Sequence, residues 1–253
     1  MKPFLRKMNK KKSIELAVNK LLSGELVIFP TETVYGLGAD ATNKNALIRI
    51  YKTKKRAKNN PIICHFHNLK QVKKHAKLNK RALRLAKKFW PGPLTLILEK
   101  RKTSNISNII SNNEKFIGCR IPNNKIINSI LQKFKKPLAA PSANISNKLT
   151  STKIDHLNKK LKKNFFINDG PCLYGLESTV IDLKSKKPRI LRHGSISEEE
   201  IKKILPEITS KLYKSKKKLS PGQETKHYSP NLPVRINVKK IIKDEVLLNF
   251  GSN

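Results

Sequence analysis

An apolar run that stops at a proline constrains the fold of this chain most strongly. Residues 26–29 have the composition of a buried strand, and Pro30 ends its hydrogen-bond ladder. Residues 31–35 are then largely polar, and Gly36 and Gly38 follow, where glycine allows close approach of another backbone or a ligand. An ordinary strand-to-loop corner gives the same pattern. If other polar clusters join it in space, the segment marks a sheet edge that carries a ligand.

Further polar clusters adjoin other apolar runs along the chain. They occupy residues 51–61, 118–122, 138–146, 176–182 and 191–194. We therefore expect widely separated corners to converge on one positively lined hollow.

The basic cluster that precedes residues 62–66 suits a polyphosphate. It holds Lys52, Lys54, Lys55, Arg56 and Lys58, followed by Asn59, Asn60 and Pro61. Lysine supplies a point charge to a phosphate and arginine a two-pronged donor. A solvated basic loop is the plain alternative, since lysine is abundant throughout this chain.

Two other clusters carry polar groups that need partners. Arg120 stands near the exit of an apolar strand, where an unpaired guanidinium is costly, so it needs either a protein carboxylate or a bound one. Ser142 and Asn144 lie in a tight turn after a strand, which can present backbone N–H groups to phosphate oxygens or be an ordinary turn. Neither a Walker lysine loop nor a GxGxxG motif follows the first strand.

Composition sets broad limits. The 253 residues are enough for one large domain or two modest ones. Lys and Arg total 55 against 17 Asp and Glu, a net charge of +38 that attracts anionic partners, although most of the lysines lie on expected solvated faces. Cys64, Cys119 and Cys172 are far apart without a CxxC pair, which supports neither a disulfide framework nor a thiolate zinc site. No apolar run approaches the ~20 residues that span a bilayer, so we expect no membrane partner and a soluble cytoplasmic protein.

The pattern of periodicity alternates helices and strands, which predicts a layered α/β fold with a mixed sheet. Helices are expected over residues 12–23, 43–52, 79–89, 124–134, 152–163 and 197–205, and strands over 26–29, 62–66, 94–98, 116–121, 138–140, 165–167, 178–183 and 188–192. Asn43 is an expected N-cap, Gly24 an expected C′ residue, and Ser197 with Glu200 an expected capping box.

As an ordered set, these clusters resemble the YrdC-like superfamily and, more narrowly, the threonylcarbamoyl-AMP synthase family in its long, two-domain form. The resemblance covers residues 12–233 and rests on six motifs. They are PTETVYGLG from Pro30, the basic stretch that ends in NNP, GCRIP from Gly118, PSANIS from Pro141, LESTVID from Leu176 and LRHG from Leu191. It implies a YrdC-like twisted mixed sheet flanked by helices, with a basic concave face.

The resemblance also implies roles for individual residues. Those matching the L-threonine site are Thr33, His65, Arg120, Ala140 and Ser178. Those matching the ATP site are Arg56, Asn60, Phe116, Ser142, Asn144, Thr150, Arg192 and Tyr228. Our mechanistic hypothesis makes Lys52 and Arg56 the catalytic residues, which neutralise the leaving pyrophosphate while a divalent ion, Mg²⁺, shares the charge. No metal is expected to be bound by protein ligands alone.

The implied reaction joins L-threonine, bicarbonate and ATP to give threonylcarbamoyl-AMP and pyrophosphate. Its product passes in such pathways to a tRNA-modifying transferase, so a downstream partner is implied together with weak RNA binding. The implied domains are a catalytic domain over residues 1–212, a linker over 213–233 and the remnant of a smaller α/β domain over 234–253. His227 and Tyr228 of the linker are expected to fold across the cleft and exclude water.

Two alternatives stay open. The chain could be a double-stranded RNA-binding module without catalysis, although Trp90 is expected in a packed corner and base-stacking aromatics are few. It could also be a carbamoyl-adenylate-forming enzyme of hydrogenase maturation, but the acylphosphatase and zinc-finger segments of such proteins are not recognisable in this sequence. The linker pattern favours the threonylcarbamoyl interpretation.

Overall fold

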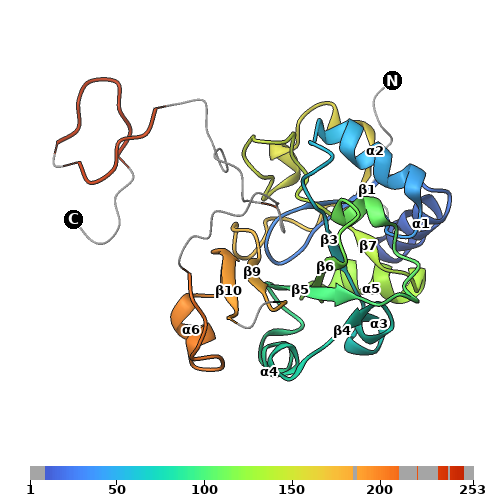
Figure 1. Cartoon of the computed structure of the whole chain (residues 1–253). Helices are drawn as coiled ribbons and strands as arrows, with labels where there is room; N and C mark the ends of the chain where they lie inside the picture. Colours follow the sequence, from blue (N-terminus) through green and yellow to red (C-terminus); the bar gives the residue numbers. More distant parts are fainter. Residues whose placement is uncertain (1–8, 185–186, 211–220, 222–232, 239, 248–253) are drawn as a thin grey trace.

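A computed structural model describes residues 9–184, 187–210, 221, 233–238 and 240–247 of the chain (Figure 1). Ten strands form one sheet in the order β10-β9-β5-β6-β3-β7-β2-β1-β8, and β4 pairs with β5 outside this path. The strands are β1 (Val27–Phe29), β2 (Gly36–Asp40), β3 (Ile63–His65), β4 (Ala76–Lys77), β5 (Leu94–Lys100), β6 (Phe116–Arg120), β7 (Leu138–Ala139), β8 (Phe165–Phe166), β9 (Thr179–Asp182) and β10 (Arg189–Arg192). The sheet combines parallel pairs such as β3 with β6 and antiparallel pairs such as β5 with β6. The predicted mixed sheet is confirmed.

Helices cover both faces of this sheet. They are α1 (Lys10–Leu22), α2 (Lys44–Lys54), α3 (Leu69–His75), α4 (Lys80–Phe89), α5 (Lys125–Phe134) and α6 (Glu198–Lys202). Figure 1 shows α1 and α5 side by side, and their apolar stripes close a small core with Val27 and Phe29 of β1. The main core lies on the other face, where Ile28 packs with side chains from α2 and α4. Successive residues of β1 thus serve opposite faces, as strand geometry requires.

The same alternation decides where an open face remains. Cys64 in the middle of β3 points into the main core, so Ile63 and His65 on either side of it point to the α1 and α5 face. Ala140, directly after β7, packs against the small core and also borders open space. The two helices therefore cover part of this face, and the uncovered part becomes a cavity.

Most predicted elements are present, with bounds shifted by a few residues. The predicted caps are confirmed: Asn43 accepts hydrogen bonds at the start of α2, and Ser197 with Glu200 forms a complete capping box on α6. Gly24 follows α1 with φ of +76°, as a C′ residue should. Trp90 is partly buried against the main core, and its indole N–H donates to the Leu94 carbonyl at 2.7 Å.

The helix predicted over residues 152–163 is wrong. Two short 3₁₀ turns, η2 (Ile154–His156) and η3 (Leu161–Lys163), take its place, because the backbone at Leu157 is extended. Ile154, Leu157 and Leu161 are all buried. The two short turns therefore bury the same apolar residues whose spacing suggested a helix.

The sequence prediction missed strands β2 and β4, helix α3 and the 3₁₀ turn η1 (Asn108–Ser111). Strand β2 contains two glycines and follows a polar segment, yet it pairs with β1 on one side and β7 on the other. Helix α3 is short and mostly basic. Within the predicted remnant domain, residues 234–236 and 246–247 form no strand, and Val234 and Val246 are exposed. The predicted domain boundaries stay predictions.

Candidate functional site

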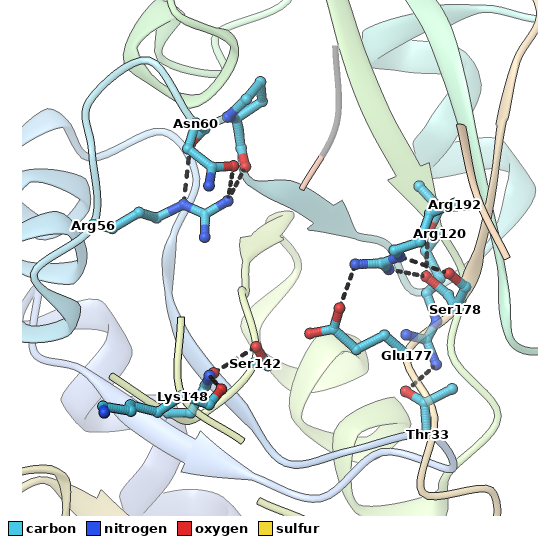
Figure 2. Close-up of polar contacts among 12 residues, drawn as sticks. Thr33, Arg56, Asn60, Arg120, Ser142, Lys148, Glu177, Ser178 and Arg192 are labelled. Carbon is cyan, nitrogen blue, oxygen red and sulfur yellow. Dashed lines mark hydrogen bonds and ion pairs between the residues drawn. The ribbon is translucent and has the colours of Figure 1, made fainter. Parts of the chain in front are cut away.

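A polar cavity lies on the open face of the sheet. It brings together Thr33, Arg56, Arg120, Ser142 and Arg192, which lie up to 159 positions apart in the sequence. Figure 2 shows Arg56 and Asn60 on one side of this space, Ser142 and Lys148 on another, and Arg120 with Arg192 on a third. The expected convergence of distant corners is therefore present in the structure.

Lys54 organises one wall of the cavity. It is the last residue of α2, and its Nζ donates to the Ser142 carbonyl at 2.5 Å, to the Asn144 carbonyl and to Asn144 Oδ1 at 3.1 Å. Ser142 Oγ donates to the same Oδ1 at 2.6 Å, and Asn144 Nδ2 donates to the Lys148 carbonyl at 2.6 Å. A buried ammonium group thus holds the turn after β7 in shape.

The structure points to Lys54 in place of Lys52 as the lysine of this wall. Lys54 is buried and lines the cavity, whereas Lys52 is exposed and is not among the residues that line it. Two residues along a helix are separated by about 200° around its axis, so the two side chains leave α2 in nearly opposite directions. The catalytic role of Lys52 stays a prediction, and this geometry favours Lys54 for that role.

Arg56 is fixed by the turn that follows α2. Its Nε donates to the Asn60 carbonyl at 3.0 Å, and its Nη2 donates to Asn60 Oδ1 and to the Pro61 carbonyl at 2.6 Å. The turn begins at Lys55, which has φ of +51° and ends the helix. These contacts use one edge of the guanidinium and aim the group at the cavity (Figure 2).

Arg120 obtains the anion that its position requires from within the protein. Its Nη2 lies 2.9 Å from Glu32 Oε1 and donates to Thr33 Oγ1 at 2.9 Å. Both members of the ion pair are almost fully buried. Of the two possibilities left open by the sequence, the protein carboxylate is present, and Arg120 also lines the cavity.

A second buried ion pair lies next to the first. Arg192 Nη1 donates to Glu177 Oε2 at 2.5 Å, and its Nη2 donates to Ser178 Oγ at 3.1 Å. Ser178 Oγ is also within 2.8 Å of the hydroxyl of Thr95 in β5. The pairing of β9 with β10 brings these groups together, since Ser178 precedes β9 and Arg192 ends β10 (Figure 2).

His65 lies in the cavity wall. Burial, and then the neighbouring Arg120 charge, hold the pKa of His65 well below its ordinary value. Its Nδ1 is buried and has no hydrogen-bond partner among the described residues. Its contact with an amino acid ligand stays a prediction.

The remaining predicted site residues fall into two groups. Asn60, Ala140, Asn144 and Ser178 line the cavity with those named above. Phe116 and Thr150 are not among its lining residues; Phe116 borders a small neighbouring pocket with Pro61. Tyr228 lies outside the described residues, but Pro221 of the same predicted linker is described and lines the cavity.

Sequence reasoning missed several groups at this site. Lys54, Glu177 and Lys148 line the cavity, and Glu32 lies behind Arg120. The helical phase of residues 44–54, which buries Ala46, Leu47 and Ile50, could have separated Lys54 from Lys52. The partners of the two buried arginines could not be read from the sequence, because they depend on how strands pair.

Lys54 gives the site an expected pH dependence. Burial, and then the Arg56 charge, lower the pKa of Lys54 to about 7. Below that pH the ammonium attracts phosphate, and as pH rises through it the charge is lost. We expect the affinity advantage of the wild type over Lys54→Met for a non-hydrolysable ATP analogue to fall from about tenfold at pH 6 to a smaller ratio at pH 9, where the neutral amine still holds the turn. Comparing both proteins by isothermal titration calorimetry at each pH cancels the effect of pH on the ligand itself. A ratio of wild-type to variant affinity that stays constant with pH contradicts the role given to Lys54.

Gly194 controls how β10 packs against the segment before β9. A Cβ added at Gly194 would lie 2.2 Å from the Glu177 carbonyl oxygen and 2.5 Å from the Thr179 nitrogen, closer than such contacts can be. Since both neighbours are backbone, Gly194→Ala must shift the segment that carries Ser178. We expect affinity for an amino acid ligand to fall at least about tenfold while the circular dichroism spectrum is kept. An unchanged affinity for the amino acid ligand would show that the position of this segment does not affect ligand binding.

The cavity wall does not form a metal site of its own. Glu177 is the single carboxylate among the described lining residues, and the described part of the chain contains no cluster of three His, Cys, Asp or Glu side chains. Mg²⁺ prefers several oxygen ligands and commonly arrives with phosphates. Any Mg²⁺ here would therefore be held mainly by a nucleotide.

No described helix is long and apolar enough to cross a membrane.

Fold and site together define a class: a twisted mixed α/β sheet with a polar, arginine-lined cavity on its open face. The family model Sua5/YciO/YrdC, described as telomere recombination, matches residues 19–194, and the model of the threonylcarbamoyl-AMP synthase C-terminal domain matches residues 196–248. The chain belongs to the Sua5/YciO/YrdC family.

Similar proteins carry more specific names. Threonylcarbamoyl-AMP synthase of Pyrococcus abyssi is 38% identical over 230 residues, which cover 87% of this chain and 66% of the relative. The enzyme of the same name from Bacillus subtilis is 35% identical over 229 residues, covering 88% and 66%. The crystal structure of P. abyssi Sua5 complexed with L-threonine matches with a TM-score of 0.80 and 37% identity over 89% of this chain and 67% of that one. This chain thus spans about two thirds of the length of these relatives.

Proposed function

We propose that this protein forms threonylcarbamoyl-AMP from L-threonine, bicarbonate and ATP. The observation that supports the proposal most is the placement of two kinds of group in one cavity. Arg120, Thr33 and Ser178 suit the carboxylate, hydroxyl and amino groups of an amino acid. Arg56 and the turn held by Lys54 suit phosphates. The names of the relatives agree with this division.

In the proposed reaction the amino group of L-threonine first takes up bicarbonate carbon, with loss of water, to give a carbamate. A carbamate oxygen then attacks the α-phosphorus of ATP, the bond from that phosphorus to the bridging oxygen breaks, and pyrophosphate leaves. The residues contribute proximity and charge: Arg120 holds the amino acid, while Arg56 and Lys54 neutralise the phosphates. Magnesium bound with ATP would share the phosphate charge. Phe116, Thr150 and Tyr228 stay proposed ATP contacts by resemblance alone.

The deciding experiment incubates the protein with ATP, bicarbonate and L-threonine and follows pyrophosphate. We expect release that requires all three, with L-serine a poorer substrate. Pyrophosphate release without threonine, or none at all from folded protein, contradicts the proposal. The product would then pass to a transferase that modifies adenosine in tRNA, and the proposed location is the cytoplasm.

The segment after α6 is proposed to cover the bound nucleotide. Pro221 supports this, because it lines the cavity although it is separated from the sheet by about 30 residues of chain. We expect a chain truncated after Leu212 to fold, as its cores are complete, but to release pyrophosphate at least about tenfold more slowly. Full activity of the truncated chain, measured beside the 253-residue protein, would remove the covering role.

A further inference from the structure

The buried pair of Glu32 and Arg120 has no counterpart in the expected roles of the site. Glu32 is 5% exposed and Arg120 is 4% exposed, and the two charged groups are 2.9 Å apart. Burying such a pair removes the hydration of both charges, so it adds little net stability compared with apolar residues. Stability alone therefore does not account for the pair.

The contacts of the guanidinium are one-sided. Arg120 Nε donates to the Gly92 carbonyl at 3.3 Å, and Nη2 contacts both Thr33 Oγ1 and Glu32. Nη1 has no partner among the described residues, and Arg120 lines the cavity. One edge of the guanidinium is thus clamped by protein, and the other donors stay available for a ligand.

Glu32 lies behind this clamp. It is not among the residues that line the cavity, although its neighbours Thr31 and Thr33 are. Its backbone is anchored: the Tyr174 N–H donates to the Glu32 carbonyl at 2.9 Å, and the Gly175 N–H donates to the Thr33 carbonyl at 3.1 Å. Neither carboxylate oxygen accepts a hydrogen bond with good geometry from a described residue, so its main interaction is the charge of Arg120.

We infer that Glu32 is a positioning residue, which holds Arg120 so that its Nη1 faces the cavity and receives the carboxylate of the amino acid substrate. The inference rests on the proposed function and adds a residue to it. Without the Glu32 charge, the guanidinium keeps only two neutral acceptors and can turn away from the ligand. Glu32 therefore acts on amino acid binding and leaves the ATP side unaffected.

The test compares Glu32→Gln with wild type in steady-state kinetics and in binding. We expect the KM for L-threonine to rise about tenfold or more, with the KM for ATP and kcat within about threefold. In isothermal titration the preference of the wild type for L-threonine over L-threoninamide, which lacks the carboxylate, should collapse in the variant. Glu32→Asp keeps the negative charge but places it one methylene further from Arg120, so it should recover part of the L-threonine affinity. It also provides the comparison with wild type if the glutamine variant does not fold.

Asp40 offers a matched control. It lies at the end of β2 that is remote from the cavity and is 4% exposed. Its Oδ2 is 2.9 Å from Lys136 Nζ. Asp40→Asn removes a buried carboxylate from an ion pair whose lysine is partly exposed, so it should lower the melting temperature and leave the KM for L-threonine unchanged. If Glu32→Gln shows a wild-type KM for L-threonine, or raises both KM values equally, Glu32 is structural only and the inference is wrong. If the wild type itself releases no threonine-dependent pyrophosphate, the proposed function has failed instead.

Discussion

Replacing Lys54 by methionine should reduce kcat/KM for ATP by about a thousandfold. The substitution keeps the length of the side chain but removes the ammonium group that is bonded to Ser142 and Asn144. Loss of a positioned charge at developing phosphate charge costs about 10²–10³ in rate. The turn that Lys54 holds also loses its support, which adds to the loss.

The measurement is pyrophosphate release at varied ATP and saturating L-threonine, with Lys52→Met as the matched control. Lys52 lies two residues away on the same helix and is exposed. The Lys52→Met variant should keep its activity within about twofold of wild type, because surface substitutions generally have small effects. If the two variants lose activity equally, the lysine that faces the cavity has no special role, and the predicted catalytic role of Lys52 gains support.

Replacing Arg120 by alanine should abolish threonine-dependent activity and also destabilise the fold. The variant leaves the Glu32 carboxylate buried without its ion-pair partner, which costs about 3–5 kcal/mol of unfolding free energy. It also removes the donor proposed for the substrate carboxylate. Chemical denaturation and the pyrophosphate assay report the two effects separately.

A double variant separates stability from function at Arg120. Arg120→Met combined with Glu32→Gln removes both charges, so most of the lost stability should return. Activity should stay absent, because no cation faces the amino acid. Recovery of activity together with stability would mean that Arg120 serves the fold alone. Arg81→Ala, at a partly exposed pair with Glu207, should change stability by less than about 1 kcal/mol.

Much of the fold follows from local patterns in the sequence. Strands such as β5 and β6 are continuous apolar runs, and α5 has a buried stripe with an Asn124 cap, so periodicity and capping identify them. Strand β2 escapes because GLGAD has little strand propensity of its own, and its two partners stabilise it. The 3₁₀ turns at residues 154–163 escape for the opposite reason, since their apolar spacing suits a helix.

The resemblance predicted which residues border the cavity better than it predicted which of them contact one another. Thr33, Arg120 and Arg192 do border one cavity. Their carboxylate partners, Glu32 and Glu177, were not foreseen, because an ion pair between residues 88 positions apart, such as Glu32 and Arg120, depends on strand order. The choice between Lys52 and Lys54 depended on helix phase, which a run of lysines hides. The roles assigned to these residues stay predictions until the variants are measured.

The walls of the cavity come from most of the length of the described chain, from Thr31 to Pro221, and include Arg192 in the last strand. A nascent polypeptide that ends before Glu177 lacks both the second ion pair and Ser178, so an incomplete chain lacks part of the proposed amino acid site. We therefore expect L-threonine to protect ribosome-arrested nascent chains from proteolysis only when they are long enough to include β10.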